Sequence, residues 1–165
     1  MRVYLPATTD RLRALLVDGG LGPGPLTAFA VTPGLREWYL DDDIEELEYA
    51  AMLEAARASL RLLDAEPAAV RRRVVIAAEI PEPAVTVRDD LDRGVVRVGE
   101  SIPLPAIASV HVDDAQAETA VGVAAEAITR ADLGDTEAQD LVDDAEGFEL
   151  SWYATQEISA LLELL

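Results

Sequence analysis

The sequence predicts a single α+β domain over residues 1–165, with a mixed sheet of four or five strands covered by helices. Half of the residues are hydrophobic, which is enough for one large core. Three strand-like segments follow one another in the middle of the chain, so a regular alternation of strands and helices is not expected. Helical periodicity dominates after residue 112, and the last 50 residues are therefore predicted to form a helical layer.

Six segments are predicted as strands because apolar, often β-branched residues alternate in them or run without interruption. They are residues 2–5, 26–31, 74–78, 85–88, 95–98 and 110–112. Pro6 is expected to end the first strand, since proline has no N–H for a strand ladder. The apolar run Val74–Ala78 is typical of a central strand buried on both faces. Residues 85–88 are expected at an edge, and residues 102–107, which hold two prolines, as a connector.

Six segments are predicted as helices from apolar stripes at helical spacing and from capping residues. They are residues 10–17, 33–39, 44–63, 114–129, 137–145 and 150–164. Thr8 or Thr9 is expected to cap the first helix and Thr32 the second. Asp41, Asp42 and Asp43 precede the third helix, where the macrodipole favours carboxylates, and Asp43 with Glu46 resembles a capping box.

The residue types that are missing exclude several kinds of chemistry. The chain has no Cys, Lys or Asn, one His, and Arg as its only basic residue type. Disulfides, thiolate nucleophiles, Schiff-base lysines and the P-loop lysine are therefore excluded. No nucleotide-binding, hydrolase-elbow or zinc-protease motif is present. We predict no catalytic residue, no metal site and no cofactor.

The charge of the chain is strongly negative and uneven. The net charge is −19, and residues 113–165 carry fourteen acids against one Arg. Such a surface repels phosphate backbones, so direct nucleic-acid binding is not expected, whereas a protein with a basic surface would be attracted. No signal peptide or apolar run of membrane-spanning length is present, which predicts a cytoplasmic protein without membrane contact.

The best local candidate for a ligand pocket lies around the last predicted strand, at Thr8, Thr9, His111, Asp113 and Asp114. In α/β proteins, ligands bind beyond the carboxyl ends of strands, where these side chains are expected. Adjacent carboxylates could contribute to a Mg²⁺ site, and the single His could act as a general base. The simpler interpretation is that an Asp caps the following helix and that His111 alternates with its apolar neighbours.

The only basic run is Arg71, Arg72 and Arg73, a candidate anion patch, because Arg binds phosphate and carboxylate in a bidentate way. The alternative is a solvated strand entry that pairs with acids of the 41–66 segment.

The apolar C-terminal helix is expected to pack on the sheet, and its outer face with Leu164 and Leu165 is a candidate surface for self-association or a partner.

Four segments resemble a known family. They are the opening MRVYLPAT, then AFAVTP at 28–33, VHVDD at 110–114 and WYATQE at 152–157, and they look like a family of uncharacterised actinobacterial proteins. The resemblance implies no activity, cofactor or partner.

Taken together, the residues predict a non-enzymatic cytoplasmic protein-interaction or regulatory domain with an acidic surface. The alternative is a small enzyme or ligand-binding domain with a pocket near Thr8, His111 and Asp113.

Overall fold

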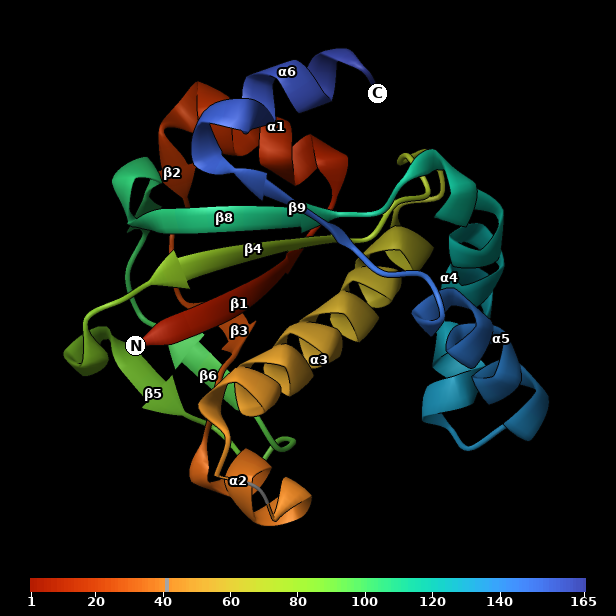
Figure 1. The fold of residues 1–165 in the computed structure, drawn as a ribbon, viewed down its shortest axis with the longest axis horizontal. Helices are drawn as coiled ribbons and strands as arrows, with labels where there is room; N and C mark the ends of the chain where they lie inside the picture. Colours follow the sequence, from red (N-terminus) through yellow and green to blue (C-terminus); the bar gives the residue numbers. More distant parts are fainter. Residues whose placement is uncertain (41) are drawn as a thin grey trace.

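The fold is built on one large sheet. The computed structural model describes residues 1–40 and 42–165, and its strands follow the order β5-β6-β3-β1-β4-β8-β9 (Figure 1). Their bounds are β1 (Arg2–Ala7), β3 (Leu26–Phe29), β4 (Val74–Glu79), β5 (Val85–Val87), β6 (Val95–Val98), β8 (Ile107–Val112) and β9 (Ser151–Ala154). Every neighbouring pair is antiparallel. The sequence predicted a mixed sheet of four or five strands. The observed sheet has seven strands, and all of its pairs are antiparallel.

A second, two-stranded sheet joins β2 (Gly20–Leu21) to β7 (Ile102–Pro103). It holds the glycine-rich segment after the first helix against residues that were predicted as a connector, and β8 then begins at Ile107.

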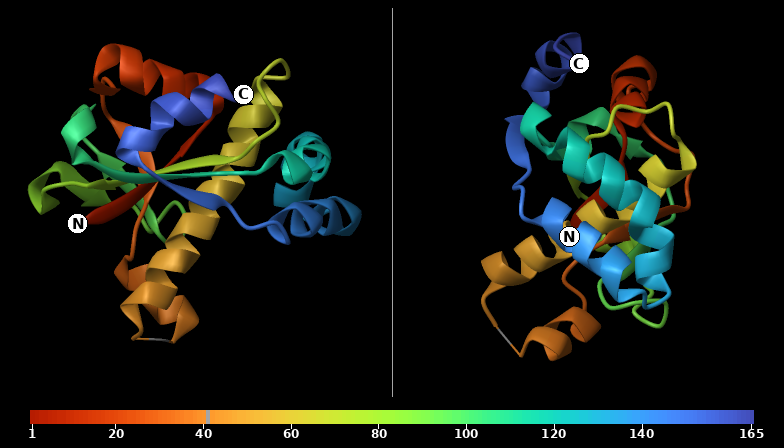
Figure 2. Two further views of the ribbon diagram at one scale, coloured as in Figure 1. Left: turned by 45° about the horizontal axis from the view of Figure 1, so that its top comes forward. Right: turned by 90° about the vertical axis from the view of Figure 1, so that its right-hand side faces the viewer.

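Helices cover both faces of the large sheet (Figures 1 and 2). Their bounds are α1 (Thr9–Asp18), α2 (Pro33–Tyr39), α3 (Ile44–Ala65), α4 (Glu118–Asp132), α5 (Thr136–Glu146) and α6 (Ile158–Glu163). Short 3₁₀ turns in the described residues are η1 (Glu82–Ala84), η2 (Leu104–Ala106), η3 (Ala115–Ala117) and η4 (Thr155–Glu157). Helices α1 and α6 pack on one face and α3 on the other, while α4 and α5 pack beside the sheet against the C-terminal half of α3.

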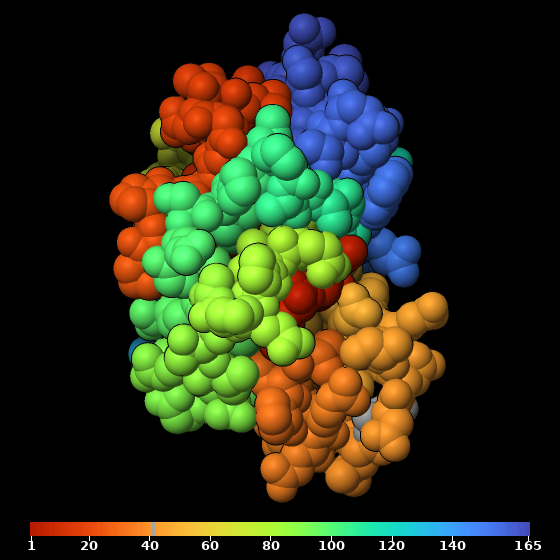
Figure 3. All heavy atoms as spheres, turned by 90° about the vertical axis from the view of Figure 1, so that its left-hand side faces the viewer, coloured from red at the N-terminus to blue at the C-terminus, as the bar shows by residue number. Residues whose placement is uncertain are grey.

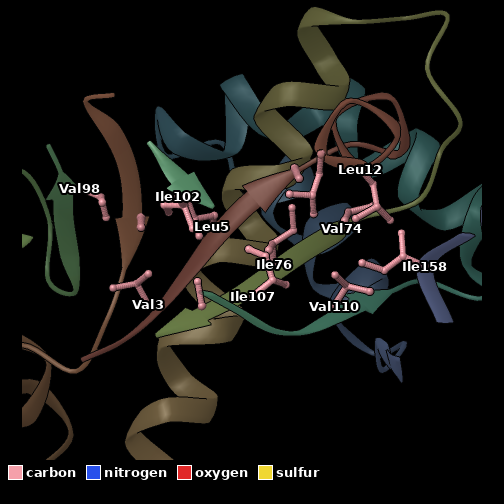
Figure 4. Close-up of a cluster of buried hydrophobic side chains, with 14 of the residues drawn as sticks. Val3, Leu5, Leu12, Val74, Ile76, Val98, Ile102, Ile107, Val110 and Ile158 are labelled. Atoms are coloured by element: carbon pink, nitrogen blue, oxygen red, sulfur yellow. The ribbon is translucent and has the colours of Figure 1, made fainter. Parts of the chain in front are cut away.

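Alternation along the strands divides the core into two faces. Val3, Leu5 and Ile76 point to the side of α1 and α6, where they meet Leu12 and Ile158 (Figure 4). The residues between them point to α3. Because β4 is fully buried from Val74 to Ala78, it is the central strand that its apolar run predicts.

The side-chain caps that were predicted for the first three helices are confirmed. Thr8 Oγ1 accepts from the N–H of Arg11 at 3.3 Å, and Thr32 Oγ1 accepts from the N–H of Leu35 at 3.1 Å. Asp43 accepts from the N–H of Glu45 at 3.0 Å at the start of α3. Asp41, also predicted at this helix start, lies outside the described residues.

Pro6 does not end the first strand, which continues to Ala7. Met1 and Ile80 exchange both backbone hydrogen bonds, so the alternation of an antiparallel ladder turns the peptide groups of residues 3, 5 and 7 toward β4. The nitrogen of Pro6 faces the other side of β1, and the ladder with β4 loses nothing.

The predicted helix over 150–164 was wrong in its first half. Residues Ser151–Ala154 form β9, which pairs with β8 at the edge of the sheet, and α6 begins only at Ile158. Ile158, Leu161 and Leu162 pack in the core, whereas Leu164 is exposed. The last 50 residues are consequently not a purely helical layer.

Candidate functional site

Of the predicted strand-end residues, Thr8 and Asp113 lie at the same end of the sheet. In the sheet register Ala7 stands beside Val74 and Val74 beside Val112, so the chain leaves β1 and β8 at the edge where it enters β4. Thr8 and Asp113 follow directly, and both are buried. The hydroxyl of Thr8 is used as the cap of α1, while that of the buried Thr9 has no hydrogen-bond partner among the described residues.

Asp113 is held by Arg73 in a buried ion pair. Its Oδ2 accepts from the backbone N–H and the Nε of Arg73, and its Oδ1 accepts from Nη2, each at 2.8 Å. Arg73 Nη2 also donates to the carbonyl of Phe148 at 2.8 Å. Both residues are about 1% exposed. Asp113 therefore does not cap the following helix, and its carboxylate is already neutralised by a cation.

The rest of the basic run is likewise engaged within the protein. Arg71 donates to the carbonyls of Leu63, Glu66 and Ala69, which closes the C-terminal end of α3. Arg72 forms an ion pair with Glu118 at 2.8 Å. The acidic partners of Arg72 and Arg73 thus lie outside the 41–66 segment, and an anion site at Arg71–Arg73 stays a prediction.

His111 lies on the α3 face of β8, so it points away from the face of its neighbours Val110 and Val112. Its Nε2 is 3.3 Å from the hydroxyl of Ser109, which is buried. Burial, with a smaller contribution from Arg2, lowers the pKa of His111 below its ordinary value. A neutral imidazole beside a serine resembles half of a nucleophilic pair, but the buried Ser109 hydroxyl offers no access to a substrate. Asp114 accepts from Ser151 at 2.9 Å and so fixes the start of β9.

Two further properties bear on the predicted classes. No three His, Asp or Glu side chains gather into a metal-binding group within residues 1–40 and 42–165. In the same residues, no helix is both long enough and apolar enough to cross a membrane.

A surface that was not predicted from the sequence lies on α2 and the start of α3. Six large apolar side chains are exposed there, namely Trp38, Tyr39, Leu40, Ile44, Tyr49 and Leu53. Trp38 is 61% exposed, Leu40 89% and Tyr49 50%. Figure 3 shows from the side how α2 and the start of α3 project from the rest of the molecule. A soluble protein rarely gathers so many large apolar side chains on one exposed projection.

A groove of about 520 Å³ lies in this projection. Its floor and walls include Tyr39, Leu47, Tyr49 and Leu53, so most of the lining is apolar or aromatic. We call it the α2–α3 groove. Aromatic side chains at the centre of such a surface are the type that contributes most to binding between proteins.

Carboxylates surround the α2–α3 groove. Asp43, Glu45 and Glu46 belong to its lining, and Glu45 and Glu46 are exposed. Part of this charge stabilises the helix, because acids are favourable in the first turn. Glu48 is not part of this lining: it accepts from the hydroxyl of Tyr4 at 3.1 Å on the side of the sheet, and burial followed by the Glu48 charge raises the pKa of Tyr4. The groove therefore combines apolar lining with a negative rim.

One wall of the projection is anchored to the body of the protein. The guanidinium of Arg93 stacks on Trp38 at 3.6 Å from the ring centre, a cation–π contact between α2 and the segment before β6. Leu40 ends α2 in the left-handed region, with φ of 50°. This conformation favours glycine, so an exposed leucine there is poorly explained by folding alone.

The sequence contained a signal for this surface. Trp38, Tyr39 and Leu40 are consecutive and are followed at once by an acidic run. Three large apolar residues at a helix end cannot all face one core, because consecutive side chains on a helix are about 100° apart.

One comparison with known proteins finds a match. The model of a family of unknown function, DUF6912, matches residues 1–162. No curated protein and no solved structure matches the chain.

Proposed function

The chain belongs to this family of unknown function. We propose that it is a protein-interaction domain that binds a basic amphipathic helix of a partner in the α2–α3 groove. The observation that carries the proposal is the exposed apolar set on this projection, three members of which, Tyr39, Tyr49 and Leu53, line a groove with a carboxylate rim. The proposal includes a cytoplasmic location, because the acidic composition that favours a basic partner also favours solubility. It includes a non-enzymatic role, because the groove has the lining of a contact surface for another protein.

The chemistry of the groove favours this occupant over others. An apolar lining takes leucine-like side chains spaced three or four residues apart on a helix, the common helix-in-groove mode of recognition. The rim takes the Lys or Arg residues on the flanks of that helix and speeds the encounter. Because apolar contact in the groove adds to charge attraction at the rim, binding is expected to weaken as salt rises without disappearing.

A peptide titration tests the proposal. The probe is a synthetic helix of about 14 residues made of Leu and Lys, with Leu at helical spacing, and the comparison peptide has Glu in place of Lys. Trp152→Phe leaves Trp38 as the single tryptophan, so its fluorescence reports on the projection. We expect saturable binding of the Lys peptide, weaker by about tenfold when NaCl rises from about 50 to 500 mM, and no binding of the Glu peptide.

Matched variants separate the groove from general charge. Glu45→Gln with Glu46→Gln changes the net charge by the same amount as Glu137→Gln with Asp140→Asn on the exposed side of α5. We expect only the first pair to weaken binding clearly. Equal loss in both would show that the peptide senses total charge and would overturn the proposed groove.

A second pair of variants tests the apolar lining of the groove. Tyr49→Ala is expected to cost about 2 kcal/mol of binding, or roughly thirtyfold in Kd, as for an aromatic at the centre of an interface. Val123→Ala removes a comparably exposed side chain from α4 and should leave Kd unchanged. Unaltered binding by Tyr49→Ala would count against the groove.

A further inference from the structure

The large sheet is open at one internal position, between β1 and β3. β1 pairs with β4 over all six of its residues, and β3 pairs with β6 over all four. Between β1 and β3, however, Tyr4 with Phe29 is the one residue pair in register within the described chain. Continuing this register by two residues places Pro6 opposite Thr27.

Backbone polarity explains why the ladder stops there. The bonds between Met1 and Ile80 turn the peptide groups of even-numbered β1 residues, including Pro6, toward β3. The N–H of Ala30 donates to Gly94 at 2.8 Å, so the same alternation turns the peptide groups of Thr27 toward β1. Pro6 has no N–H to offer, and the Thr27 carbonyl opposite it cannot be paired by this strand.

A pocket of about 510 Å³ occupies this opening. Pro6 and Thr27 line it from the two strands, and α1 and the glycine-rich segment after it complete the walls. Its apolar lining includes Leu5, Leu26 and Leu62. The pocket thus combines strand peptide groups, which act as a template for another extended chain, with a mostly apolar enclosure.

Helix α1 adds two opposite charges to this pocket. Arg11, Ala14 and Asp18 all line it, and their spacing by three and four residues places them on one side of the helix. Neither Arg11 nor Asp18 forms an ion pair among residues 1–40 and 42–165. At 1.5 Å per residue, the two positions are about 10 Å apart along the axis.

We propose that the opening between β1 and β3 binds a short extended peptide with free ends, about three residues long. Its backbone adds to the exposed peptide groups of Thr27 and Pro6, its carboxylate meets Arg11 and its ammonium group meets Asp18. Three extended residues span about 10 Å, which matches the spacing of the two charges. Small or apolar side chains fit the enclosure. This site is separate from the α2–α3 groove, and each proposal can fail without the other.

The test is an amide-resolved NMR titration with the tripeptide Ala-Leu-Ala. We expect saturable shifts at the amides of Thr27 and Ala14, and binding at least about tenfold weaker for the N-acetylated, C-amidated form. Arg11→Gln and Asp18→Asn should each weaken binding of the free peptide several-fold. Arg13→Gln and Asp10→Asn lie on the same helix but outside the pocket lining, and should bind as the wild type does.

Pro6→Ala gives an independent measurement, because it restores the missing N–H. We expect the ladder to extend to Thr27, hydrogen exchange at the Thr27 amide to slow, and peptide binding to be lost while the melting temperature is kept. Should Pro6→Ala fail to fold, the α1 variants still decide. The proposal is overturned if the free tripeptide gives no saturable shifts, if the blocked peptide binds equally well, or if Arg13→Gln weakens binding as much as Arg11→Gln.

Discussion

Replacing Asp113 by Asn should destabilise the protein severely, because it leaves the guanidinium of Arg73 buried without its counter-ion. Asp113 accepts three hydrogen bonds of 2.8 Å from Arg73, and both side chains are almost fully shielded from water. Breaking such a pair by removing one partner costs about 3–5 kcal/mol. For a chain of this size each kcal/mol lowers Tm by about 2–4 °C, so we expect a loss of roughly 6–20 °C.

The assay is thermal and urea unfolding at pH 7, with a surface pair as the matched control. Arg88 holds Asp90 through the same two-pronged geometry, at 2.9 and 3.0 Å, but on an exposed turn. Asp90→Asn should leave Tm nearly unchanged, because exposed ion pairs contribute little.

A double replacement tests the cause. Arg73→Met combined with Asp113→Asn removes the stranded charge, so its loss should be smaller than the sum of the two single losses by about 2 kcal/mol. The buried pair would not be the source of the stability if Asp113→Asn had the same Tm as Asp90→Asn. The same conclusion would follow if the free-energy losses of the two single variants simply added up to that of the double variant.

Three further predictions concern single side chains. The imidazole of His111, the only His, should titrate by proton NMR with a pKa below its ordinary value of about 6.5. Because the folded pKa is lowered, the contribution of His111 to stability should fall as pH drops below about 6.5. A titration midpoint above that value would contradict the burial argument. Leu40→Gly should raise stability by about 1 kcal/mol in urea unfolding, because glycine adopts the left-handed backbone without strain. The same variant should bind the Leu/Lys peptide more weakly. Ser59→Ala should cost about 1–3 kcal/mol, since the buried hydroxyl donates to the Ala7 carbonyl at 2.8 Å and accepts from the Val74 N–H at 3.1 Å; no loss would mean that these groups find other partners.

Local signals predicted much of the fold. Thr8, Thr32 and Asp43 were recognisable as helix caps because a side chain reaches an N–H only two or three residues away. The central strand over 74–78 was recognisable because burial on both faces leaves a continuous apolar run.

What the sequence did not reveal depends on distant partners. Residues 151–154 continue smoothly into a helical pattern, and only the pairing with β8 makes them a strand. Asp113 looked like a helix cap because its real partner, Arg73, is 40 positions away. Pro6 looked like a strand end because the sequence does not tell on which side of the strand its nitrogen lies. The α2–α3 groove was missed because the run Trp38–Leu40 signals only that an apolar side chain is exposed, while the groove itself depends on how α3 places Tyr49 and Leu53 beside Tyr39.

The strand order has a consequence for how the chain folds. β1 is synthesised first, yet it lies in the middle of the sheet, and its full-length partner β4 begins at residue 74. At a synthesis rate of about 5–20 residues per second, β1 waits several seconds for that partner. Sheets dominated by such distant pairings fold slowly, since loop closure precedes the gain from contact. The Val3 and Leu5 side chains are therefore exposed on the nascent chain, and this stage is where aggregation or chaperone binding should concentrate.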